Sequence, residues 1–232
     1  MPSAPEDGET AGHSPYVQRD VGGLPSRISL RARRRMLGRL LDRVRPTAAT
    51  RVLDVGATSD RRVDSNFFEK LYPWPAAVVA TGVEPMAFLR DERPGLTLVQ
   101  ADGLALPFPD RSFDLAVCFA VIEHVGSRER QRRLVHELCR VARRCCIATP
   151  NRWYPVEFHS LLPLVHWLPP ARFRALLRRL GRGFWAEEAN LNLLSERDLR
   201  GLFPAGVALR TDHHRLLGPV SNLVIHGEWT GA

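Results

Sequence analysis

The chain has 232 residues, 44% of them hydrophobic and 25% charged, with a formal net charge of +8 and an isoelectric point near 10.3. These values suit one soluble α/β domain and exclude a membrane-spanning chain, because no apolar run approaches the roughly 20 residues that cross a bilayer. This excess of basic residues makes nucleic acid a partner to consider. However, Lys70 is the only lysine, and the richness in Arg, Ala, Pro and Gly is typical of a GC-rich coding bias, so a solvated basic surface is favoured over a polyanion partner.

The beginning of the chain has the composition of a tail. Residues 1–15 are rich in Pro, Glu, Gly, Ser and Thr and lack a basic start followed by an apolar core, so no secretory signal is expected. We predict a disordered tail over residues 1–27 and a single domain over residues 28–232. Residues 29–44 then place apolar side chains at helical spacing between arginines, which predicts a basic amphipathic helix packed on a sheet edge or over a ligand.

Three short apolar runs follow, and each leads to an acidic residue near its end. They occupy residues 50–56, 78–84 and 96–103. Such runs are typical of buried parallel strands whose carboxyl ends face a ligand. Gly56 removes a side chain where backbone must approach that ligand, and Glu84 can accept hydrogen bonds from both hydroxyls of a ribose.

The remaining elements continue an alternating pattern with one interruption. We predict strands over residues 113–120, 145–149, 206–212 and 221–229, and helices over residues 65–71, 171–180 and 195–203. Ser127 can cap a further helix whose apolar stripe is Leu134, Leu138, Val141 and Ala142, and Pro150 stops the fifth strand. Between that strand and the helix at 195 the pattern lapses over residues 151–190.

The ordered strand ends, together with the segment LALPFPDRSFD at residues 104–114, resemble the class I S-adenosylmethionine-dependent methyltransferases, in particular the small-molecule, methyltransferase type 11-like branch. The resemblance covers residues 50–150. It implies a Rossmann-like, doubly wound, mostly parallel seven-stranded sheet with helices on both faces, a substrate-region insertion at 151–190 and S-adenosylmethionine as cofactor. The expected cofactor-binding residues are Asp54, Gly56, Thr58, Glu84, Asp102, Gly103 and Phe119.

The first motif departs from the family pattern. The loop GATSD at residues 56–60 keeps only the first of the alternating glycines, and the distance from Asp54 to Glu84 exceeds the roughly 20 residues of a dinucleotide-binding unit. We expect Thr58, Ser59 and Asp60 to bind the ammonium or carboxylate of the cofactor instead. A plain connection in a fold that has lost its ligand is the alternative.

Two histidines are candidate catalytic groups. His124 follows the fourth strand beside Glu123 and can act as a general base, although methyl transfer itself needs little more than in-line positioning. The alternative for this pair is a helix start fixed by hydrogen bonds. His159 lies in the insertion and is the expected polar contact to the methyl acceptor.

Aromatic residues around His159 predict an apolar pocket or lid. The expected substrate-binding residues are Trp153, Tyr154, Phe158, His159 and Trp167, and a small aromatic core is the alternative. His159 and His166 are seven residues apart without a carboxylate or cysteine at ligand spacing, so no metal site is predicted. The four cysteines lack a CxxC pair and suit a reducing, cytoplasmic setting.

These patterns predict an enzyme that moves a methyl group from S-adenosylmethionine to oxygen, nitrogen or carbon of a small or lipid-like acceptor. An RNA methyltransferase is the first alternative, supported by the basic balance. A noncatalytic interaction module is the second, supported by the altered glycine loop. The acceptor and the oligomeric state are not encoded in any pattern of the sequence.

Overall fold

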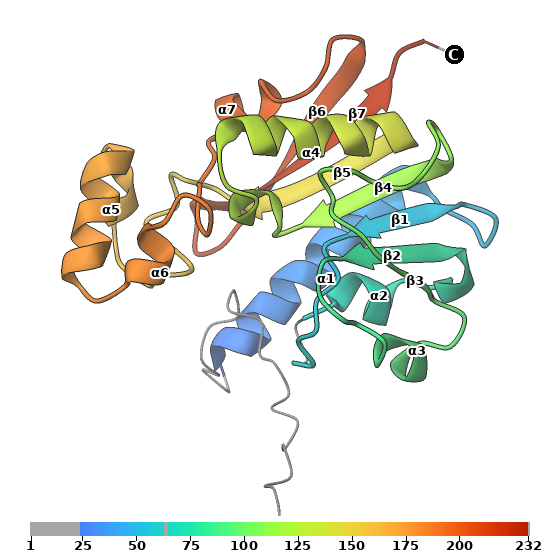
Figure 1. The fold of residues 1–232 in the computed structure, drawn as a ribbon, viewed down its shortest axis with the longest axis horizontal. Helices are drawn as coiled ribbons and strands as arrows, with labels where there is room; N and C mark the ends of the chain where they lie inside the picture. Colours follow the sequence, from blue (N-terminus) through green and yellow to red (C-terminus); the bar gives the residue numbers. More distant parts are fainter. Residues whose placement is uncertain (1–23, 63–64, 232) are drawn as a thin grey trace, which may run out of the picture.

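The computed structural model describes residues 24–62 and 65–231 and contains a seven-stranded sheet (Figure 1). In spatial order the strands are β3 (Thr97–Gln100), β2 (Val78–Gly82), β1 (Val52–Val55), β4 (Phe113–Phe119), β5 (Ala142–Pro150), β7 (Val220–Trp229) and β6 (Val207–Arg215). β1 to β5 run parallel, whereas β7 is antiparallel to both of its neighbours. This confirms the predicted doubly wound, mostly parallel sheet. Its strand order reverses between β1 and β4, the place where such sheets bind ligands at their carboxyl ends.

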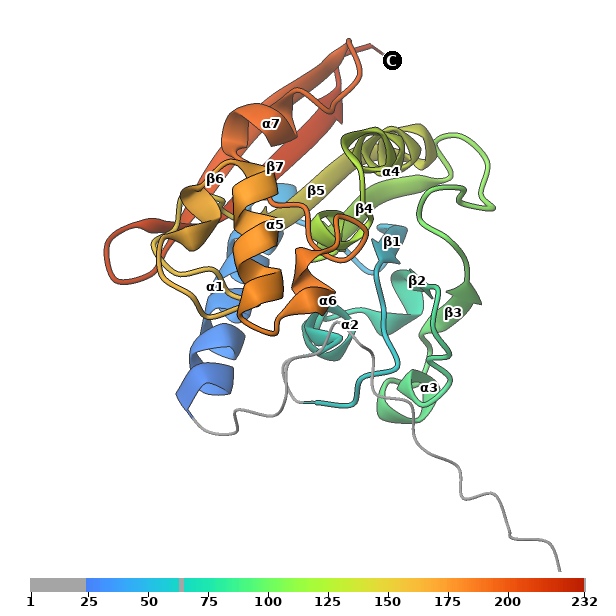
Figure 2. The same ribbon diagram turned by 60° about the vertical axis from the view of Figure 1, so that its left-hand side comes forward.

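Helices cover both faces of the sheet (Figures 1 and 2). They are α1 (Leu24–Val44), α2 (Phe67–Leu71), α3 (Leu89–Glu92), α4 (Arg128–Val141), α5 (Pro170–Arg179), α6 (Gly183–Ala186) and α7 (Glu196–Arg200), with short 3-10 helices η1 (Pro75–Ala77), η2 (Ile122–His124) and η3 (Val165–Trp167). Alternate residues of a strand point to opposite faces. Leu53 and Val55 therefore join the core under α4 and α7, while Val52 joins the core under α1, α2 and α3.

The helix and the strand predicted after Ser127 are both present in the structure, as α4 and β5. The Ser127 side chain accepts a hydrogen bond from the Arg130 backbone and caps α4. Leu134, Leu138 and Val141 of the predicted stripe are buried on this helix, whereas Ala142 is the first residue of β5. β5 follows α4 without a loop. It begins three residues before the predicted strand and ends at Pro150.

The starts of α1 and α2 also differ from the prediction. α1 begins at Leu24, so residues 24–27 are helical and not part of the predicted tail, whose residues 1–23 lie outside the described part of the chain. α2 begins at Phe67 and not at residue 65, because Asn66 before it adopts a left-handed conformation with φ 51°. Both differences concern where a helix starts, which apolar spacing fixes poorly.

The insertion between β5 and α7 has a small core of its own. This third apolar cluster consists of Phe173, Leu177, Ala186, Leu191 and Leu193. A bridge between Asn151 and Leu194 joins the two ends of the insertion beside the sheet, and α5 and α6 stand outside the sheet at one end of its strands (Figures 1 and 2). Among the described helices, none is long and apolar enough to cross a membrane.

Candidate active site at the carboxyl ends of the strands

The loop after β1 and the acid after β2 meet at the edge where the sheet order reverses. Backbone N–H groups of Gly56 and Ala57 both donate to the Thr81 carbonyl, at 2.8 and 2.9 Å. Beyond them, the Ser59 backbone N–H and hydroxyl donate to one carboxylate oxygen of Glu84, at 2.9 and 2.7 Å. Two expected cofactor-binding residues, Gly56 and Glu84, are therefore brought to one edge of the sheet.

Two glycines allow this close approach. Gly56 has φ 122°, and a Cβ there would lie 2.1 Å from Val121 Cγ2. A Cβ on Gly82 would lie 1.9 Å from the Ala57 carbonyl oxygen. Side chains at these positions would separate the strand ends, so Gly56 is required by the packing of the protein itself, before any ligand is considered.

Side-chain hydrogen bonds hold the altered loop in place of the missing glycines. Asn66 accepts from the Thr58 backbone at 2.9 Å and donates to the Thr58 and Asp60 carbonyls, each at 3.0 Å. The buried Asp60 carboxylate accepts hydrogen bonds from Arg62 and Ser65. Burial alone would raise the pKa of Asp60, but these bonds outweigh it and lower that pKa. The Asp60 carboxylate, expected to bind the cofactor, is thus engaged within the loop.

Asp54 lies in a buried carboxyl pair. Its side chain is on the α2 side of β1, next to Glu69, and both residues are almost fully buried. Burial and then the charge of Glu69 raise the pKa of Asp54 well above its ordinary value. One oxygen of Glu69 has no hydrogen-bond partner among the described residues. Only 5% of the surface of Asp54 is exposed.

The other expected cofactor-binding residues lie around the same edge. Asp102 is exposed after β3, and one of its oxygens accepts from the Leu104 backbone at 2.9 Å. Val83, which follows β2 and was not among the expected residues, is 65% exposed. Phe119 ends β4 and makes an edge contact with Phe67 of α2, with ring centroids 5.2 Å apart.

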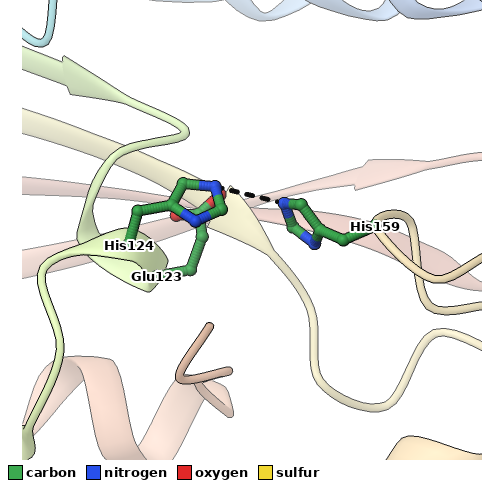
Figure 3. A group of neighbouring side chains, drawn as sticks. All are labelled: Glu123, His124 and His159. Atoms are coloured by element: carbon green, nitrogen blue, oxygen red, sulfur yellow. Dashed lines mark hydrogen bonds and ion pairs between the residues drawn. The ribbon is translucent and has the colours of Figure 1, made fainter. Parts of the chain in front are cut away.

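Both predicted catalytic histidines meet at the end of β4 (Figure 3). Their Nε2 atoms are 3.2 Å apart, although the residues are 35 positions apart in the sequence. His124 Nδ1 lies 2.7 Å from the Asn190 carbonyl, and His159 Nδ1 lies 2.7 Å from Glu157 Oε1. Glu123, beside His124, accepts a hydrogen bond from the Thr149 hydroxyl at 2.9 Å. η2 and the insertion together thus build one polar cluster.

Burial and charge set the protonation of this cluster. Burial, followed by the neighbouring His159, lowers the pKa of His124 to about 3. Burial alone would lower the pKa of His159, but its hydrogen bond to Glu157 and the charge of Glu157 raise it. Although burial opposes ionisation of Glu157, the bonds from His159 and Ser160 lower its pKa to about 2. Burial raises the pKa of Glu123.

The expected substrate-binding residues separate into three groups. His159 joins the cluster at the strand ends, whereas Tyr154 and Phe158 stack on each other with centroids 5.1 Å apart. Trp153 and Trp167 form an edge contact on the surface and are 52% and 43% exposed.

Three residues of the cluster were missed from the sequence. They are Glu157, Asn190 and Trp185, whose ring lies 4.9 Å from that of His159. Only Glu157 had a usable signal, because an acidic residue two positions before a histidine can orient its ring.

Comparison with known families supports a methyltransferase. A family model described as a methyltransferase domain matches residues 65–145. The match starts after β1 and its loop, so the altered glycine motif lies outside it.

Curated relatives match over short segments. An Encephalitozoon cuniculi protein named as a methyltransferase is 45% identical over 58 residues, which are 24% of this chain and 28% of that protein. A Mycobacterium tuberculosis protein named as an S-adenosylmethionine-dependent methyltransferase is 40% identical over 70 residues, which are 29% of this chain and 24% of that protein. The chain therefore spans about a quarter of the length of these relatives.

Solved structures share the fold over most of the chain. Magnesium protoporphyrin IX methyltransferase from Synechocystis, solved with bound SAH, is 13% identical with a TM-score of 0.55, over 91% of this chain and 90% of that one. The YcgJ protein of Bacillus subtilis is 16% identical with a TM-score of 0.55, over 89% and 100%. At these identities the structures bear on the fold alone. The methyltransferase-domain match over residues 65–145, the short matches to relatives named as methyltransferases and the shared fold all agree with the motifs of residues 50–150.

Proposed function

We propose that this protein transfers a methyl group from S-adenosylmethionine to oxygen, nitrogen or carbon of a small or lipid-like acceptor. The observation that carries the proposal is that the acidic strand ends and the histidines of η2 and the insertion lie at the same carboxyl edge of the sheet. The cofactor supplies an electrophilic methyl group on a sulfonium. The task of the protein is then to hold donor and acceptor in line.

The cofactor side has the hydrogen-bond acceptors that a nucleoside requires. Ser59 fixes Glu84 through two hydrogen bonds to one oxygen, so the carboxylate is preorganised to accept the two ribose hydroxyls. The exposed Val83 beside it offers an apolar surface to a base, and Asp102 offers an acceptor to an exocyclic amine. The residues proposed to bind the cofactor are Asp54, Gly56, Thr58, Glu84, Asp102, Gly103 and Phe119.

The acceptor side is the insertion. Its surface exposes large apolar side chains, namely Trp153, Val156, Leu161, Leu164, Trp167, Leu168, Leu180 and Phe184. Apolar groups gathered on one segment suit an acceptor with an apolar part. His124 of η2 and His159 of the insertion, whose Nε2 atoms are 3.2 Å apart, are the proposed polar contacts to the acceptor.

Calorimetric titration with S-adenosylhomocysteine tests the cofactor site. We expect Glu84→Ala to weaken binding by about 1.5–3 kcal/mol, roughly 10- to 150-fold, because charge-assisted bonds to two hydroxyls are lost. Glu129→Ala, on the exposed surface of α4, is the matched control and should bind like wild type. Equal affinity of Glu84→Ala and wild type would refute the site, and no binding by wild type would favour the noncatalytic alternative.

The acceptor is found by incubating the protein and methyl-labelled cofactor with fractionated cell extract. We expect the label in an organic-soluble or small-molecule fraction. Label confined to RNA would overturn the proposed acceptor class in favour of the first alternative. Glu84→Ala, assayed at a cofactor concentration near the wild-type dissociation constant, should lower the incorporated label in every fraction.

A further inference from the structure

Glu123, His124 and His159 lie close together and each offers one ligand-type atom (Figure 3). These atoms all lie within 4.8 Å of one another. The two Nε2 atoms are 3.2 Å apart, and Glu123 Oε1 is 4.0 Å from His124 Nε2. Two nitrogens bound tetrahedrally to zinc at about 2.0–2.1 Å are roughly 3.3 Å apart. The histidine pair already has that spacing, whereas the Glu123 oxygen, 4.0 Å from His124 Nε2, would have to move closer to complete the site.

The partners of the two rings fix which nitrogen carries hydrogen. The Asn190 carbonyl can only accept, so His124 Nδ1 donates to it, and the Glu157 carboxylate likewise accepts from His159 Nδ1. In the neutral rings both Nε2 atoms then present lone pairs to the same space. Two lone pairs at this distance require a proton or a cation between them. A carboxylate behind a histidine is also the usual support of a metal ligand.

Glu123 contributes an oxygen that lacks a partner. The residue has no solvent exposure, and its Oε2 accepts from Thr149. Its Oε1 has no hydrogen-bond partner within residues 24–62 and 65–231. A buried carboxylate oxygen left in this way is costly unless a cation or a proton compensates it. Arg33 acts on Glu123 as a positive charge, and Glu157 is the other acid facing the cluster.

We propose that Glu123, His124 and His159 bind a divalent transition-metal ion, with Zn²⁺ the ion that suits them best. Two imidazoles and one carboxylate form a zinc donor set that leaves a coordination position for water or an acceptor oxygen. With neutral rings, the two charges of the ion balance those of Glu123 and Glu157. No metal site was predicted from the sequence because His159 was paired there with His166. In the structure His166 Nε2 lies 2.8 Å from the Tyr154 carbonyl and is not part of the cluster.

The test uses the full-length chain, freed of metal with a chelator and titrated with ZnCl₂, with Co²⁺ as a spectroscopic substitute. We expect one ion per chain in the wild type and visible Co²⁺ bands of a four-coordinate site. His124→Ala and His159→Ala should each weaken zinc binding at least 100-fold. His136→Ala, an exposed histidine on α4, is the matched control and should leave binding unchanged.

A further variant keeps the test decisive if a histidine variant fails to fold. Glu157→Gln retains the shape of the orienting group and should weaken zinc binding about 10- to 100-fold, as loss of an outer-shell partner does. Wild type that binds zinc no better than His124→Ala or Glu157→Gln would overturn the proposal. S-adenosylhomocysteine titration of the same samples separates the two ideas, because loss of cofactor binding with zinc binding intact refutes only the proposed function.

Discussion

Gly56→Ala should destabilise the protein through two separable effects. At φ 122° a residue with a Cβ is strained, which costs about 1–3 kcal/mol. The new Cβ would also lie 2.1 Å from Val121 Cγ2, and relieving such overpacking costs a further 1–3 kcal/mol or so. The expected loss in the free energy of unfolding is therefore roughly 2–6 kcal/mol, a large part of the stability of a typical domain.

A double-mutant cycle with Val121→Ala separates the two effects. Removing both γ carbons leaves the Val121 Cβ, which would lie 3.4 Å from the new Cβ and is an ordinary contact. The double variant should therefore recover about 1–3 kcal/mol relative to the sum of the single variants, while the backbone strain remains. Urea unfolding followed by circular dichroism measures all four proteins. Additivity within about 0.5 kcal/mol would show that the contact with Val121 is not the obstacle and would refute the reasoning.

Two further predictions concern pH. Burial opposes ionisation of Asp212, but the hydrogen bonds from Arg43 and the charge of Arg43 lower the pKa of Asp212. The ionised carboxylate therefore stabilises the fold above about pH 4, and this contribution disappears as the pH falls through the lowered pKa. Asp212→Asn should lose about 1–2 kcal/mol at pH 7 in denaturant unfolding, and the deficit should shrink steadily as the pH is lowered from about 4 toward and below the lowered pKa; a deficit that does not change below about pH 4 would contradict this. The raised pKa of Asp54 has the opposite sign, since stability present below about pH 4 is lost as pH rises through the raised value. Glu69→Gln, whose amide can donate to Asp54, should melt above wild type at pH 8 and converge with it near pH 4, and a variant that melts lower at both pH values would contradict the assignment.

The sheet could be predicted from sequence because its signals are local. The apolar run of residues 113–120, the capping Ser127 and the stop at Pro150 each act within a few residues and appear in the structure nearly as predicted. The starts of α1 and α2 were less predictable, since they depend on backbone conformation at single residues such as Asn66.

The candidate site was predictable only in parts. The positions of Glu84 and Gly56 could be predicted because each lies just after a strand whose apolar run is visible in the sequence. The meeting of His124 with His159 was not, because the path of the insertion decides it and no local pattern encodes that path. The conformation of the loop after β1 was not predictable either, because it is held by hydrogen bonds between Asn66 and the backbone of Thr58, eight residues away.

The contact between α1 and β6 bears on how the chain acquires its structure. Both carboxylate oxygens of Asp212 accept from Arg43, at 2.8 and 2.7 Å, across a sequence separation of 169 residues. During synthesis on a ribosome, α1 emerges long before β6, so Arg43 lacks its Asp212 partner while the intervening strands form. The Arg43–Asp212 contact therefore forms late, and closing so long a loop carries an entropic cost that slows this step.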